Sequence, residues 1–73
     1  MKRIEINPAV CGGKPVIKGT RITVQTVLGY LSAGDSLEEV LQAHPSLTRE
    51  DVLACLEYAR RLSEVHTTVE LVS

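Results

Sequence analysis

The sequence predicts a mainly α-helical fold: a bundle of three short helices, with a short β-strand arm before it and a strand-like tail after it. Three observations support this prediction. Apolar residues recur at helical spacing, about every 3.6 residues, from residue 24 to residue 62. Gly34 and Pro45 divide that stretch into three parts. At both ends of the chain apolar and polar residues alternate instead, as they do in strands.

Length and composition indicate one domain. The chain has 73 residues, of which 44% are apolar, and it contains neither Phe nor Trp. A core built from aliphatic side chains in so short a chain is marginal, so we expect a homodimer. No apolar run approaches the ~20 residues of a membrane span, and residues 1–5 lack the apolar stretch of a secretory signal. We therefore expect a cytoplasmic protein with an arm (1–22), a helical part (23–62) and a tail (63–73).

The arm combines short strands and turns. Residues 3–7 alternate, which places Ile4 and Ile6 on one face of a strand that ends at Asn7 and Pro8. The two glycines at 12 and 13 interrupt regular secondary structure again. Residues 14–17 predict a second short strand, with Pro15 at its start, and residues 18–21 predict a turn.

The first helix is predicted from Val24 to Ala33, with Thr23 as its N-cap and Gly34 as the left-handed residue that ends it. Gly29 lies inside this helix, where glycine is unfavourable, and close packing of a second helix or backbone would explain it. The apolar face of the helix consists of Val24, Val27, Leu28 and Leu31.

The second helix begins with a capping box formed by Ser36 and Glu39, and the His44-Pro45 pair ends it. Thr48 is the predicted N-cap of the third helix, and Leu47 before it can pack on Val52 as a hydrophobic staple. The predicted inward stripe of the third helix consists of Val52, Cys55, Leu56, Ala59 and Leu62.

The tail alternates again, which predicts a short strand. A short strand is not stable alone, so it must pair with the arm, with another subunit or with a different protein. Its apolar positions Val65, Val69 and Leu71 are the candidate partner-binding residues.

No set of residues predicts catalysis, a metal or a cofactor. Cys11 and Cys55 fit no zinc spacing with His44 and His66. The Gly12-Gly13-Lys14 run lacks the Ser or Thr that follows the lysine of a phosphate-binding loop. We therefore expect a protein that is not an enzyme and needs no cofactor.

Charge is divided unevenly along the chain. Residues 1–21 hold five cations and one acid, whereas residues 22–73 hold three cations and eight acids. A basic arm on an acidic body is one form of nucleic-acid footprint. The alternative is that these charges only keep a short glycine-rich segment solvated and bind no nucleic acid.

The second and third helices, joined by the turn at residues 44–47, fit helix-turn-helix geometry. The third helix would then enter the DNA major groove with its first residues against base edges. These residues are Thr48, Arg49, Glu50 and Leu53. Because Glu50 and Asp51 would repel phosphates, a dimer and phosphate contacts from the arm would be needed. The arm residues concerned are Lys14, Lys18 and Arg21. The alternative is an interaction or dimerisation module that binds no DNA.

Two long motifs resemble a known family. Residues 12–24 read GGKPVIKGTRITV, and residues 36–41 and 44–52 read SLEEVL and HPSLTREDV. In this order they resemble the domain of unknown function 433 family over about Ile4 to Leu62, although His44 stands where the family often has Tyr. The resemblance implies a homeodomain-like fold and a VapB-like antitoxin that binds operator DNA and a PIN-like nuclease toxin. It implies that the turn of Gly19, Thr20 and Arg21 faces DNA together with the third helix. The tail, Glu64 to Ser73, lies beyond the motifs and is the candidate toxin- or subunit-binding segment.

Overall fold

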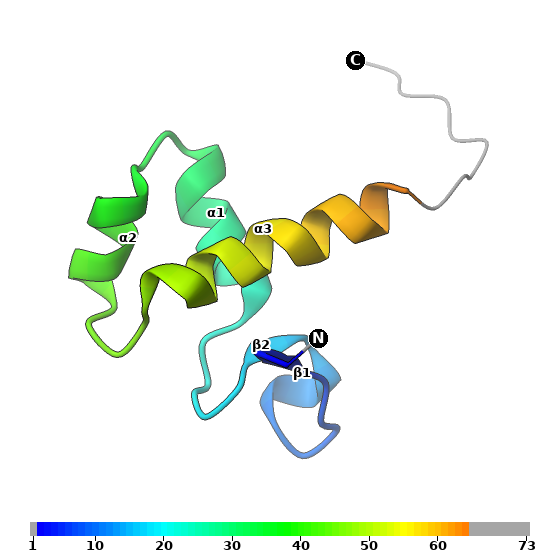
Figure 1. Cartoon of the computed structure of the whole chain (residues 1–73). Coiled ribbons are helices and arrows are strands. Elements are labelled where there is room, and N and C mark those ends of the chain that lie inside the picture. The colour runs from blue at the N-terminus through cyan, green and yellow to red at the C-terminus, as the bar shows by residue number, and fades with distance from the viewer. Residues whose placement is uncertain (1, 65–73) are drawn as a thin grey trace.

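The computed structural model describes residues 2–64. It confirms the predicted mainly α fold, in which three helices follow a short two-stranded sheet (Figure 1). The predicted C-terminal strand lies outside the described residues. The elements in chain order are β1 (Ile4–Glu5), the 3-10 helix η1 (Cys11–Gly13), β2 (Val16–Ile17), α1 (Val24–Ser32), α2 (Leu37–Ala43) and α3 (Arg49–Ser63).

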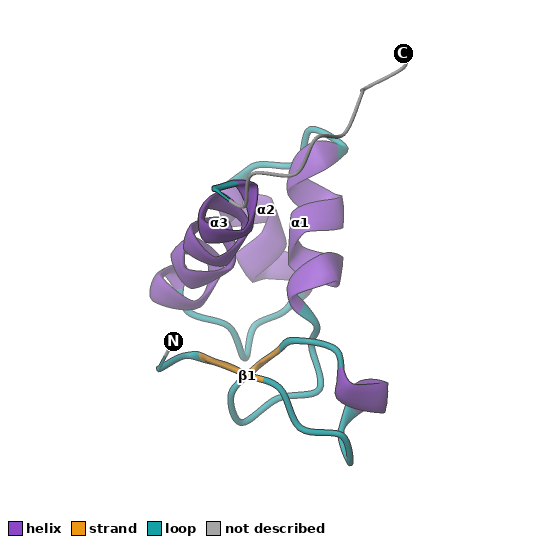
Figure 2. Cartoon of the chain, turned by 90° about the vertical axis from the view of Figure 1, so that its right-hand side faces the viewer, coloured by secondary structure: helices purple, strands orange, loops and turns teal. Residues whose placement is uncertain are grey.

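The arm forms a small antiparallel sheet beneath the helices (Figure 2). Ile4 pairs with Ile17, and Glu5 pairs with Val16. The first strand is shorter than expected, and the placement of Ile6 beside Ile4 was wrong: Ile4 is buried, whereas Ile6 is 61% exposed. The reason is the turn that begins at Asn7, whose carbonyl accepts from the amide of Val10 and whose side chain accepts from Ala9.

The three predicted N-caps are confirmed. The hydroxyls of Thr23, Ser36 and Thr48 accept hydrogen bonds from the amides three residues on, at 3.1, 3.1 and 3.2 Å. Glu39 closes the predicted capping box of α2 by accepting from the amide of Ser36. Gly34 has φ +103°, the left-handed conformation expected after the end of α1.

The core lies where the helices meet the sheet. Its buried members are Ile4, Val16, Ile17, Val24, Val27, Val40, Leu47, Val52 and Cys55. Leu47 and Val52, the predicted staple, are both buried. The expectation for α3 was only half correct, because Leu56 and Leu62 are 43% and 56% exposed. Leu62 lies near the C-terminal end of α3, which extends beyond the other helices (Figure 1). Leu56 lies at the middle of α3 and is exposed because of the side of the helix on which it stands, since Tyr58 and Ala59 farther along the helix are half-buried.

None of the helices formed by residues 2–64 has the length and apolar content that crossing a membrane requires.

Candidate nucleic-acid interface

The turn between α2 and α3 is held firmly to the core. The amide of Leu47 donates to the carbonyl of His44 at 3.0 Å, and the Leu47 side chain is buried. The His44 ring lies 5.5 Å from the ring of Tyr30, tilted by 58°. This anchoring fixes the turn from which α3 begins.

Asp51 organises the first turn of α3. Its Oδ2 accepts from the amide of Thr48 at 3.0 Å, which completes a second capping box. Its Oδ1 accepts from Nη1 of Arg3 at 3.0 Å. Burial alone would raise the pKa of Asp51, but the hydrogen bonds from Thr48 and Arg3 and the positive charge of Arg3 hold it below its ordinary value.

The expectation that Asp51 would repel phosphates is therefore wrong. Its side chain is turned toward the arm and is buried, and Arg3 neutralises its charge. Glu50 remains exposed at the start of α3. Of these two acids only Glu50 faces outward, which weakens the electrostatic objection to DNA at this end of the helix. Glu38 of α2, however, adds an exposed acid beside Arg49.

The predicted base-reading residues are exposed. Thr48, Arg49, Glu50 and Leu53 all lie at the surface. Nη1 of Arg49 lies 3.8 Å from Oε1 of Glu38 in α2, and both side chains are more than 60% exposed. A long contact between exposed charges stabilises little, so Arg49 can leave Glu38 for a ligand at small cost. The hydroxyl of Thr48, in contrast, is engaged as the cap.

The predicted phosphate-binding residues of the arm are exposed too. These residues are Lys14, Lys18 and Arg21. The Sγ of Cys11 donates to the carbonyl of Arg21 at 3.4 Å, which joins the segment of residues 11–14 to the turn of residues 18–21. Cys11 itself has φ +50°, which is unusual outside glycine. The hydroxyl of Thr20 donates to the carbonyl of Ile17 at 2.7 Å and accepts from the amide of Ile22, so it shapes the turn.

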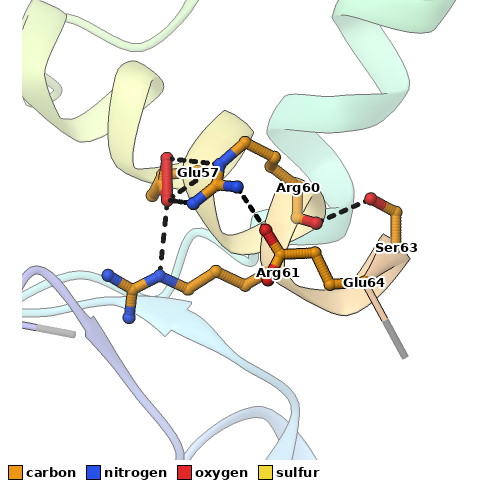
Figure 3. A network of polar contacts seen from close by, with 5 residues as sticks. All are labelled: Glu57, Arg60, Arg61, Ser63 and Glu64. Atoms are coloured by element: carbon orange, nitrogen blue, oxygen red, sulfur yellow. Dashed lines mark hydrogen bonds and ion pairs between the residues drawn. The ribbon is translucent and has the colours of Figure 1, made fainter. Parts of the chain in front are cut away.

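The cations at the end of α3 are neutralised locally. Arg60 contacts Glu57 and Glu64, and Arg61 contacts Glu57 (Figure 3). These bonds lower the pKa of Glu57, chiefly through the hydrogen bond from Arg60. Across residues 2–64 the cations outside any ion pair are Lys2, Lys14, Lys18 and Arg21. Unpaired positive charge is thus concentrated in the arm.

An apolar groove runs between α1, α3 and the start of β2, with a volume of about 590 Å³. We call it the α1–α3 groove. Its lining residues are Lys14, Pro15, Val24, Gln25, Leu28, Gly29, Ser32, Tyr58, Ala59 and Leu62. The expectation that another segment packs closely on Gly29 was wrong within residues 2–64, because a Cβ placed there would meet no atom within 4 Å.

Sequence reasoning missed two features of this surface. It did not foresee the groove, although Gly29 inside a helix was a signal of it. It also did not pair Arg3 with Asp51, which are distant in the sequence. The candidate partner-binding residues Val65, Val69 and Leu71 lie outside the described residues.

Comparisons with known proteins place the chain among related sequences. It is 42% identical over 53 residues to the uncharacterized protein y4eO of Sinorhizobium fredii, a match that covers 73% of this chain and 24% of that protein. The crystal structure of a DUF433 member protein from Anabaena variabilis matches with a TM-score of 0.79 and 40% identity. That match covers 85% of this chain and 61% of the other. The chain thus spans less than two thirds of either relative. Residues 4–59 match the model of the family described as protein of unknown function (DUF433), and the chain belongs to that family.

Proposed function

We propose that this chain is a DNA-binding helix-turn-helix protein that acts as a dimer and as an antitoxin. One observation supports DNA binding most directly: the unpaired cations of residues 2–64 lie in the arm, and Arg3 fastens the arm to the exposed start of α3. The arm that carries these cations thus contacts the candidate base-reading end of α3. The protein would act without catalysis.

The arm and α3 would make different contacts with DNA. Lys18 and Arg21 would neutralise phosphates, a contribution that does not depend on DNA sequence. Arg49 would exchange Glu38 for a base edge, where an arginine can donate two hydrogen bonds to guanine. Each phosphate contact would release counterions, so affinity would fall steeply with salt. A dimer would double these contacts and bring two α3 helices to sites about one DNA turn, roughly 34 Å, apart.

The antitoxin role rests on the family resemblance and on the sequence of the C-terminal segment. Val65, Val69 and Leu71 alternate with polar residues, a pattern that suits addition of a strand to a partner's sheet. The partner would be a PIN-like nuclease. Co-purification of the full chain with such a nuclease encoded beside it tests this role, and Val69→Asp should abolish capture. Capture unaffected by Val69→Asp would remove the segment from the interface.

A salt titration tests DNA binding. The full chain would be titrated onto duplex DNA from upstream of its own reading frame, at about 50 to 200 mM salt. Lys18→Ala and Arg21→Ala should each lower the slope of log affinity against log salt by about 1. Arg61→Ala is the matched control, since it removes one charge from a cation that is already paired. Absence of binding at low salt, or an equal effect of Arg61→Ala, would contradict the proposal.

A second candidate is a protein-interaction module that binds no DNA. The α1–α3 groove favours it, together with Leu53, Leu56 and Leu62, which are 43% to 56% exposed. Exposed apolar area of this kind marks interaction surfaces. The same titration separates the two candidates, because this one predicts no DNA binding at any salt concentration.

A further inference from the structure

We infer that the α1–α3 groove is the surface through which two copies of this chain associate, with Gly29 and Leu62 at the contact. The inference deepens the proposed function and rests on it, since a DNA-binding dimer needs such a surface. Its test, however, uses no DNA. The occupant is a second copy of this chain for three reasons, taken in turn below.

The first reason is Gly29. Glycine weakens a helix interior, and such a position is useful where another backbone must come close. Within residues 2–64 no atom would lie within 4 Å of a Cβ at Gly29. Residues 2–64 therefore leave room for another chain to approach α1 closely at Gly29.

The second reason is that the surface around the α1–α3 groove contains both a hollow, the groove itself, and a projecting side chain, Leu62. Leu62 lines the groove, yet it is 56% exposed because the end of α3 extends past the other helices (Figure 1). Under two-fold symmetry each copy contributes the same patch, so a projecting side chain of one copy meets the hollow of the other. Leu62 of each copy can thereby lie over Gly29 of its partner.

The third reason is charge. Among residues 2–64, Lys14 is the one charged residue that lines the groove. The neighbouring charges on α3, at Glu57, Arg60, Arg61 and Glu64, are paired with one another (Figure 3). Two such faces can meet without net repulsion between their helices. The part of the lining that residues 2–64 supply has too little positive charge for a nucleic acid and no carboxylate for a basic partner.

The size of the patch sets the expected affinity. Stable interfaces bury about 800 Å² and about 20–30 residues per partner, and this chain exposes 5390 Å² in total. Residues 2–64 supply ten lining residues to the groove, between a third and a half of that number. The dimer should therefore be weak, with a dissociation constant on the order of micromolar.

Sedimentation equilibrium of the full chain tests the inference. The apparent mass should rise from 8.0 kDa toward twice that value as concentration increases from about 1 to about 500 µM. Gly29→Gln should raise the dissociation constant at least about tenfold without lowering the melting temperature, because its side chain enters open space and favours a helix. Leu62→Glu should have the same effect on association. Ala43→Gln, at an exposed position of α2 outside the groove, is the matched control.

A wild-type chain that stays monomeric, or a dimer unaffected by both groove variants, would overturn the inference. Suppose that the wild-type chain is monomeric and that Val69→Asp shifts the methyl resonances of Leu28 and Leu62 relative to the wild type. The groove is then occupied by the chain's own C-terminal segment. If a monomer captures a PIN-like nuclease and Gly29→Gln abolishes that capture, the occupant is a different protein. A wild-type dimer that binds no DNA would remove the proposed function and leave this inference standing.

Discussion

Arg3 and Asp51 lie 48 positions apart in the sequence and form a direct ion pair, with 3.0 Å between Nη1 and Oδ1. The other carboxylate oxygen, Oδ2, accepts from the amide of Thr48 and caps α3. One side chain thus joins the arm to α3 and closes the helix end. Together with the buried side chains of Ile4 and Ile17, this pair holds the arm against the helices.

Arg3→Ala should lower the free energy of unfolding by about 1 kcal/mol. The Arg3 side chain is 49% exposed, whereas that of Asp51 is 12% exposed. Water therefore weakens the attraction, but the variant leaves a largely buried carboxylate without its cation. Urea denaturation measures the change. Arg21 is an exposed arm cation that forms no ion pair within residues 2–64, so Arg21→Ala should change stability by less than about 0.5 kcal/mol. Equal stabilities for the two variants would contradict this prediction.

The effect of Arg3→Ala should depend on pH. Burial would raise the pKa of Asp51, but hydrogen bonds from Thr48 and Arg3 hold it below its ordinary value of 3.8. A carboxyl whose pKa is lower in the folded state stabilises the fold above its unfolded pKa, and this stabilisation is lost as the pH falls through the folded pKa. The difference in stability between wild type and Arg3→Ala should be complete above about pH 5 and should shrink toward pH 2. A difference that stays constant over this range would show that the charge of Asp51 is not involved.

The two cysteines should differ in reactivity. Burial, and after it the charge of Asp51, raises the pKa of Cys55 from 9.0 to about 11. The thiolate is the reactive form, and Cys55 is fully buried, whereas Cys11 is partly exposed. Iodoacetamide at pH 8 should therefore modify Cys11 and spare Cys55 in the folded protein, as read by peptide mass spectrometry. Both should react in urea. Modification of Cys55 at a similar rate without denaturant would mean that the elements packed against α3 do not keep its thiol covered.

Local sequence was sufficient to predict most of the helical architecture. Thr23, Ser36 and Thr48 cap the helices as expected, because a cap depends on residues within one turn. Gly34 ends α1 for an equally local reason. Helix ends are set by such short-range hydrogen bonds, so they can be found without knowledge of the tertiary fold.

The features that were missed depend on tertiary contacts. Asp51 looked like an exposed acid of a first helical turn, and only its distance to Arg3 in the folded chain shows otherwise. Leu56 and Leu62 continue the apolar stripe of α3, but the bundle covers neither the side on which Leu56 lies nor the helix end that carries Leu62. Periodicity identifies the face of a helix and not the length of its partners. The candidate site was therefore predictable as a list of exposed residues, whereas its charge balance and the groove were not.

Removing the acid beside Arg49 should strengthen DNA binding. Glu38 lies 3.8 Å from Arg49, so it competes with a base or phosphate for the guanidinium and also repels DNA. Glu38→Gln should tighten binding to the upstream DNA several-fold at low salt, with a smaller gain as salt screens the charges. Asp35→Asn is the matched control, since it removes the same charge between α1 and α2 at a residue that forms no ion pair within residues 2–64. Gel-shift titrations of both variants give the comparison. If Asp35→Asn tightens binding as much as Glu38→Gln, the gain reflects net charge alone and Arg49 does not read DNA.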